Sequence, residues 1–308
     1  MNTFKFLSLY GLRFGCAIGL LTPSAMRAAD GEITTVCSRV SDDYFRTRLP
    51  GGAFETETYA FGEGGNWRGT MKDASIDNLK FMDIARTISR PLGDKNFICT
   101  KNPSKTKLLI MVYWGTTTGS GDAANSLAYR SLAQANGALI NAQGALGAAS
   151  KADALSAQLS KESAGRQFDG MLALVGMENR QREIADSKNA SMLGYDAEGI
   201  ISTDYGRGLR GTALHLKWAD LTEEIEENRY FVVLMAYDFQ LMWREKKPKL
   251  LWETRYSIRQ RGNNFDQQLA AMTQSASRYF GLESHGLIRK PQRQESIKLD
   301  EIKILDDK

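Results

Sequence analysis

A glycine-rich stretch is the first candidate for chemistry in this 308-residue chain. Gly115, Gly119 and Gly121 fall in residues 115–121, which follow an apolar run at 108–114 and precede a helix-forming segment. Backbone amides at a helix N-terminus bind phosphate, so these glycines are candidates for a phosphate or nucleotide site. The stretch has no P-loop lysine, and no second strand with an acidic residue follows at dinucleotide-fold spacing. A plain strand-to-helix turn explains the same residues and is the favoured interpretation.

Other residues that could carry chemistry are sparse. The two histidines, His215 and His285, lie far apart, and no cysteine or carboxylate cluster has the spacing of a metal site. The glutamates of residues 222–227 are typical of a solvated helical turn. The chain contains no Gly-x-Ser-x-Gly motif. We therefore expect no catalytic residue, no metal and no cofactor.

The N-terminal residues 1–29 have the pattern of a signal peptide. Lys5 and Arg13 precede a short apolar run at 14–21, and Pro23 breaks this run ahead of small residues where cleavage is expected. Removing the leader would lower the formal net charge from +4 to +1, because it also carries Arg27. We expect export to the periplasm or the extracellular space, without a stable membrane span; an uncleaved anchor is the alternative. Interspersed charges argue against nucleic-acid binding.

The three cysteines divide between the leader and the mature chain. Cys16 follows Arg13-Phe14-Gly15, which is not the sequence of a lipoprotein signal, so Cys16 is expected to leave with the leader. Cys37 and Cys99 remain. An even number of cysteines in an exported protein favours a disulfide between these two. Two separately buried thiols are the alternative.

Alternating and continuous apolar patterns predict about five strands and two amphipathic helices. A glycine cluster at 62–65 is expected to end the first strand in a turn, and residues 244–249 are expected to join the last two strands. The predicted strands are residues 57–61, 96–100, 108–114, 230–243 and 250–260, and the predicted helices are residues 76–92 and 265–280.

A long insert rich in alanine separates the third strand from the fourth. Leucines and alanines alternate at spacings of four and three, which is the pattern of a heptad seam. The seam residues are Leu132, Ala135, Leu139, Ala142, Leu146 and Ala149. This helical stretch, residues 123–167, is expected to pack antiparallel on the apolar face of residues 168–175 as a hairpin. A partly disordered, low-complexity insert is the alternative.

The order of these elements resembles an uncharacterised domain family of bacterial envelope lipoproteins and secreted proteins. The similarity rests on residues 58–61, 76–92, 107–118, 230–238 with Trp252, and 265–280. This resemblance implies a two-layer α/β sandwich with a mixed sheet, and it brings no catalytic residues. The chain departs from the family in lacking a lipid-bearing cysteine and in carrying the helical insert.

The sequence thus predicts an α+β protein in five parts. These are a signal peptide at 1–29, a first half of the sandwich at 30–122, a helical insert at 123–211, a second half at 212–285 and a charged, loose tail at 286–308. The predicted function is that of a non-catalytic envelope protein that binds another envelope protein or its own copy through the insert. The alternative is a phosphate- or nucleotide-binding protein or enzyme that uses residues 115–121.

Overall fold

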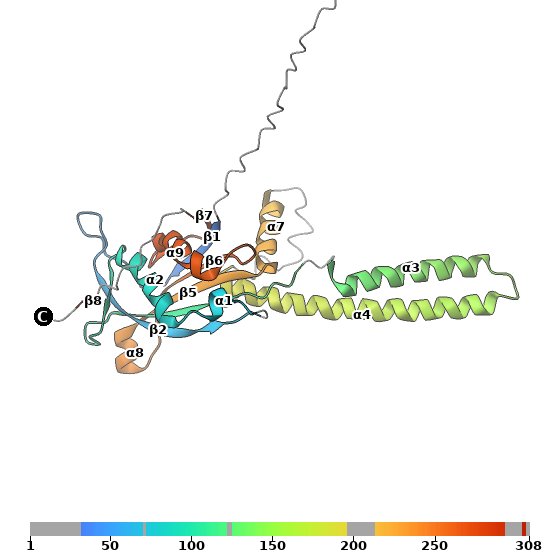
Figure 1. Cartoon of the computed structure of the whole chain (residues 1–308), viewed down its shortest axis with the longest axis horizontal. Coiled ribbons are helices and arrows are strands. Elements are labelled where there is room, and N and C mark those ends of the chain that lie inside the picture. The colour runs from blue at the N-terminus through green and yellow to red at the C-terminus, as the bar shows by residue number, and fades with distance from the viewer. Residues whose placement is uncertain (1–31, 70–71, 122–124, 196–212, 293–303, 306–308) are drawn as a thin grey trace, which may run out of the picture. The chain divides into compact units, whose positions relative to one another are not determined.

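An eight-stranded mixed sheet organises the part of the chain that the structure describes (Figure 1). This structure is a computed structural model that describes residues 32–69, 72–121, 125–195, 213–292 and 304–305, with the backbone alone for 213–219 and 304–305. The strand order is β7-β1-β6-β5-β4-β2-β3-β8. The strands are β1 (Ile33–Val40), β2 (Glu57–Trp67), β3 (Phe97–Thr100), β4 (Leu108–Thr116), β5 (Arg229–Asp238), β6 (Leu250–Arg259), β7 (Ile288–Pro291) and β8 (Ile304–Leu305).

The α+β class is confirmed, but the prediction of about five strands was wrong. β1 pairs with β6 and β7, and β8 pairs with β3 at the opposite edge of the sheet. β7 also corrects the expectation of a loose tail at 286–308, because residues 288–291 form a ladder with β1. β7 and β8 are short edge strands, where the sequence pattern is weak. β1 has eight residues and pairs on both sides, but its buried Thr34, Thr35 and Ser38 hide the apolar pattern of a strand.

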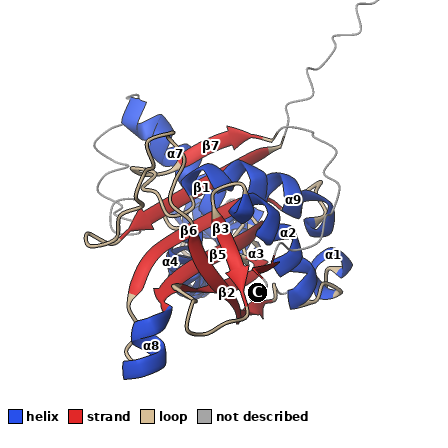
Figure 2. Cartoon of the chain, turned by 90° about the vertical axis from the view of Figure 1, so that its left-hand side faces the viewer, coloured by secondary structure: helices blue, strands red, loops and turns tan. Residues whose placement is uncertain are grey.

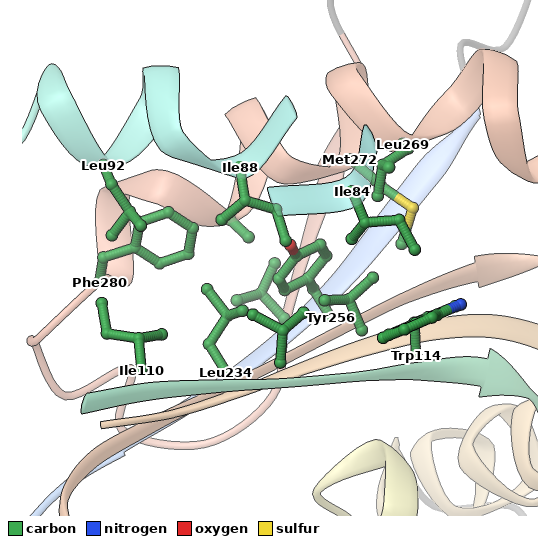
Figure 3. Close-up of a cluster of buried hydrophobic side chains, with 14 of the residues drawn as sticks. Ile84, Ile88, Leu92, Ile110, Trp114, Leu234, Tyr256, Leu269, Met272 and Phe280 are labelled. Atoms are coloured by element: carbon green, nitrogen blue, oxygen red, sulfur yellow. The ribbon is translucent and has the colours of Figure 1, made fainter. Parts of the chain in front are cut away.

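One face of the sheet carries the main hydrophobic core beneath helices α2 (Phe81–Gly93) and α9 (Phe265–Ala276). Figure 3 shows Ile84 and Ile88 of α2 and Met272 of α9 directed at Ile110, Trp114 and Leu234 of the sheet. These two helices are the predicted pair. A short helix, α1 (Ala74–Asp77), precedes α2, and Asp73 caps it by accepting a hydrogen bond from the Ser75 amide at 3.0 Å.

The opposite face of the sheet is also covered, which corrects the two-layer expectation. Phe231 and Val233 of β5 pack with residues of α4 (Ala154–Leu193) and α7 (Ala213–Glu226). Their neighbours Val232 and Leu234 point into the main core. Because successive side chains of a strand point to opposite faces, the continuous apolar run of β5 is buried on both sides.

Glycines at 62–65 continue β2, where a turn was expected. A Cβ on Gly62 would lie 2.3 Å from Met111 Sδ, and one on Gly64 would lie 2.5 Å from Tyr113 Cε1. The side chains of β4 therefore lie over these glycines, and the strand runs on to Trp67 through a register shift between Glu63 and Gly65. The glycines of β2 allow the neighbouring strand β4 to approach closely. Glycine flexibility, which predicted a turn here, does not reveal this role.

The connection between β5 and β6 differs from the predicted strand over 230–243. β5 ends at Asp238, whose side chain accepts a hydrogen bond from the Leu241 amide at 2.9 Å and so caps α8 (Phe239–Glu245). Residues 239–243 are apolar enough for a strand, but the aspartate starts a helix there. The predicted β5–β6 pairing itself is present.

The helical insert forms an antiparallel hairpin of α3 (Leu127–Ala148) and α4, which lie side by side in Figure 1. The turn between them falls at residues 149–153, inside the segment 123–167 that was expected to be one helix. The partner of α3 is therefore a helix that begins at Ala154, well before Phe168. Figure 2 gives the view in which α4 lies behind the sheet.

Candidate functional site

The α3–α4 hairpin, here called the arm, is held together by the predicted heptad seam. Along α3 the seam residues are the less exposed ones, and Ala135 is the most buried of them at 2% exposure. Their neighbours Ala133, Gln134 and Asn136 are exposed. Alanine at this position lets the backbone of α4 approach closely.

α4 presents a matching row of residues to α3. Most of its less exposed positions up to Ala185 recur at spacings of seven, four and three, as expected of a heptad helix. This row consists of Ala157, Ala164, Phe168, Met171, Val175, Glu178, Arg182 and Ala185. The predicted partner face of α3 included Leu172, but Leu172 is half exposed and points away from the row.

The arm also exposes many large apolar side chains. The described residues contain fourteen exposed large hydrophobic residues, and eight of them lie on the arm, which shows that this exposure is concentrated there. These eight are Leu127, Ile140, Leu155, Leu159, Leu172, Leu174, Met177 and Ile184. Such concentration is typical of surfaces that meet another molecule.

Polar contacts fix the base of the arm to the sheet. Asn189 of α4 is buried and donates hydrogen bonds to the carbonyl oxygens of Thr118 at 2.8 Å and Ile225 at 3.0 Å. Arg182 donates to the carbonyl of Gly121, and Arg255 of β6 donates to the carbonyl of Ser191 at 2.8 Å. Nearly all described contacts to the sheet come from the C-terminal part of α4, so the arm is anchored at one end.

A second polar cluster lies beside this anchor. The Tyr195 hydroxyl donates to Glu224, and Arg289 of β7 donates from Nε to Glu224 at 2.7 Å. Burial raises the pKa of Tyr195, and the neighbouring Glu224 raises it further. The tyrosine therefore stays neutral and serves as a hydrogen-bond donor.

In the glycine-rich residues 115–121, backbone amides that could face a phosphate already donate hydrogen bonds to other groups of the protein. The amide of Thr117 donates to the Arg229 carbonyl at 2.9 Å, and the amide of Gly119 donates to Asn228 Oδ1 at 2.7 Å. A Cβ on Gly119 would lie 2.1 Å from the Glu226 carbonyl oxygen, and one on Gly115 would lie 2.1 Å from that of Trp67. Both glycines are thus explained by close backbone approach, and this geometry does not favour a phosphate site.

The predicted disulfide between Cys37 and Cys99 is not present, because both cysteines are free thiols. Cys37 lies on β1 and Cys99 on β3, with β6, β5, β4 and β2 between them. Five strand spacings correspond to roughly 24 Å, whereas bridged Cα atoms lie within about 7 Å. The sequence did not reveal this separation because no strand was predicted at β1. The number of cysteines gives no information about the order of strands in the sheet.

Two hollows lie outside the arm's seam. A cavity of about 370 Å³ at one end of the sheet is lined in part by Glu57, Lys107 and Asp238. Burial raises the pKa of Glu57, but its carboxylate already accepts a hydrogen bond from Tyr44 at 2.7 Å and lies 3.7 Å from Arg46. A more open groove of about 530 Å³ lies between Trp67 and α4.

The remaining candidates for metal or acid–base chemistry are not assembled. Within the described ranges, no group of three His, Cys, Asp or Glu residues is placed to hold a metal ion. His285 is exposed on a turn, and the side chain of His215 lies outside the described residues, as does the whole predicted signal peptide. Glu227, from the acidic run, pairs with Arg259 at 2.9 Å.

Neither a protein-family model nor a curated protein matches this chain. The resemblance to the envelope domain family therefore remains a prediction. Among the helices of the described residues, none combines the length and apolar character that crossing a membrane requires.

Proposed function

We propose that this protein is a non-catalytic, exported envelope protein that binds other proteins through the arm. The observation that carries this proposal is the concentration of exposed apolar side chains on α3 and α4. A two-helix hairpin buries little surface by itself, and most helix stability in proteins comes from packing of an apolar face. A binding partner would cover the remaining apolar surface. The sheet acts as the support, since Arg255 of β6 donates to α4 at the Ser191 carbonyl, and Asn189 and Arg182 of α4 donate to the loop that follows β4.

The proposal is tested by shortening the arm without disturbing its base. Deleting residues 133–146 and 157–170 removes two heptads from each helix and keeps both the turn at 149–153 and the register of the seam. The contact of Tyr129 with Asn179 and the contacts of Asn189 remain. Tagged full-length and shortened proteins would be cross-linked in the envelope fraction of their host.

We expect the full-length arm to capture cross-linked protein and the shortened arm to lose this capture while its sheet signal in circular dichroism persists. Equal capture by both proteins would contradict the proposal. Intact-mass measurement of the exported protein tests the predicted leader separately, because retention of residues 1–29 would exclude a cleaved signal peptide.

A further inference from the structure

One broad side of the arm has an unusual composition. In each helix, the residues that immediately precede the seam positions carry no charge. In α3 they are Leu127, Ser131, Gln134, Ala138, Asn141, Ala145 and Ala148. In α4 they are Ser156, Ser163, Gln167, Gly170, Leu174, Met177, Gln181 and Ile184. Because the two right-handed helices run antiparallel, both sets lie on the same side of the hairpin. We call this side the uncharged face.

The uncharged face is accessible. All of its residues are exposed except Ser131, which is half-buried. Ala190, seven residues after Glu183 and so on the other broad side, packs against the sheet with Phe231. Near the base of the arm, Ile184 of the uncharged face lines the groove beside Trp67 and is 71% exposed. That other side carries the carboxylates of Asp169, Glu183 and Asp186, which follow seam positions of α4.

The absence of charge is informative because exposed helix positions in water normally carry many Lys, Glu and Arg residues. α3 contains a single charged residue, Arg130, in 22 positions. Depletion of charged residues is a property of the centres of protein interfaces. The face is therefore suited to contact with another uncharged surface.

The distribution of side-chain size on this face is complementary to itself. Large residues lie near the base of the arm, where Leu127, Leu174 and Met177 are 78%, 47% and 61% exposed. Small residues such as Ala145, Ala148, Ser156 and Ser163 lie toward the turn at 149–153. If two arms pack antiparallel about a two-fold axis near Ala138, the large residues of one meet the small residues of the other.

We propose that the uncharged face binds the same face of a second copy of this chain, which forms an antiparallel four-helix bundle from two arms. This inference rests on the proposed function of the arm and names its partner. α3 is about 33 Å long at 1.5 Å per residue, so two helices offer roughly 600 Å² per copy. That area reaches the lower range of specific interfaces.

The test compares two glutamate substitutions two residues apart on α3. Ala138→Glu places a charge at the centre of the uncharged face, close to its own copy across the two-fold axis. Asn136→Glu places the same charge at an exposed position on the other broad side. The full mature chain of each variant would be examined by analytical ultracentrifugation, with circular dichroism as a check of helicity.

We expect wild type and Asn136→Glu to form dimers and Ala138→Glu to weaken dimerisation by at least about 100-fold, because two unpaired charges would be buried together. Dimerisation that survives Ala138→Glu, or that is lost equally in both variants, would overturn the assignment of this face. A monomeric wild type would overturn the second copy as partner, while capture of another protein by the full-length arm would still support the proposed function.

The relative orientation of the two arms in the dimer can be measured separately. Spin labels at Ala148→Cys in a Cys99→Ser background report the distance between the two arm tips. The antiparallel bundle predicts about 30 Å along the axis between labels that lie ten residues from its centre. A much shorter distance would indicate parallel arms and would contradict the proposed packing.

Discussion

The carboxylate of Asp73 joins three separate parts of the chain. Its Oδ1 caps α1, and its Oδ2 accepts hydrogen bonds from the Tyr230 hydroxyl and from Gln260 Nε2, the latter at 3.0 Å. Partial burial raises the pKa of Asp73, but the hydrogen bonds from Tyr230, Ser75 and Gln260 outweigh it and lower the pKa below its usual value. The ionised form is thus favoured in the folded protein.

This arrangement predicts the effect of Asp73→Asn. Asparagine can still cap α1, but its amide nitrogen replaces the oxygen that accepts from Tyr230 and Gln260, so stability near neutral pH should fall by about 1–3 kcal/mol. Because the folded-state pKa is lowered, the wild type holds this stability above the unfolded-state pKa and loses it as pH falls through the folded-state pKa. Urea unfolding across acidic pH should show that loss in the wild type and a flatter profile in the variant. Equal slopes would contradict the role of this carboxylate.

Gly119 should tolerate no side chain. A Cβ there would meet the carbonyl of Glu226 at 2.1 Å, and a backbone cannot move as easily as the end of a side chain. Gly119→Ala should therefore lower stability by about 1–3 kcal/mol. The matched control is Gly144→Ala on α3, where the added Cβ meets nothing within 4 Å. That change should raise helix stability by about 0.5–1 kcal/mol. Thermal unfolding of both variants measures these changes in stability. An unchanged melting temperature for Gly119→Ala would contradict the predicted clash.

At the scale of elements, the seam of the arm predicts where α3 tolerates a larger side chain. Ala135 is buried against α4, so Ala135→Leu should force the helices apart and cost about 1–3 kcal/mol. Ala133→Leu adds the same volume at an exposed position of α3 and should be nearly neutral. Hydrogen exchange along residues 127–193 compares the two. Faster exchange in both variants, or in neither, would show that Ala135 is not a contact position.

The elements with strong periodic patterns could be predicted from the sequence. Ile84, Ile88 and Leu92 recur at helical spacing and face the core in α2, and the Leu/Ala alternation lies along the less exposed side of α3. Such patterns record burial directly, because a residue's face is fixed by its position in the repeat. The turn at 149–153 was missed although Ser150 and Asp153 are residue types that cap helices, because the Leu/Ala repeat continues without a break up to Ala149.

The features that were missed depend on residues distant in sequence. Gly62 and Gly64 are typical of a turn until Met111 and Tyr113 lie over them. Cys37 and Cys99 form a reasonable pair by sequence, but in the sheet four strands lie between them. In the same way, Asn189 has no distinguishing neighbours in sequence, and its role depends on the carbonyls of Thr118 and Ile225. Tertiary contacts override local preference in each case.

At the scale of the whole molecule, Asn189 couples the arm to the loop after β4 and to α7. Asn189→Ala leaves two carbonyl oxygens without this donor and should cost about 2–3 kcal/mol. The loss should be local, so hydrogen exchange should accelerate in the last turns of α4 and in the described part of α7 before it does in β5. Asn136→Ala at an exposed site of α3 is the control. Unchanged exchange at the base would show that the other contacts suffice.

The position of the arm between two paired strands has a kinetic consequence. β5 and β6 pair across residues 239–249, whereas β4 and β5 pair only after the chain has closed residues 117–228. A loop about ten times longer costs about 2 kcal/mol more in closure entropy. The β5–β6 pair should therefore form early in refolding, and β4 should join it late. Until then β5 presents an unpaired apolar edge to other folding chains, and an arm that folds early would shorten the loop that β4 and β5 must close.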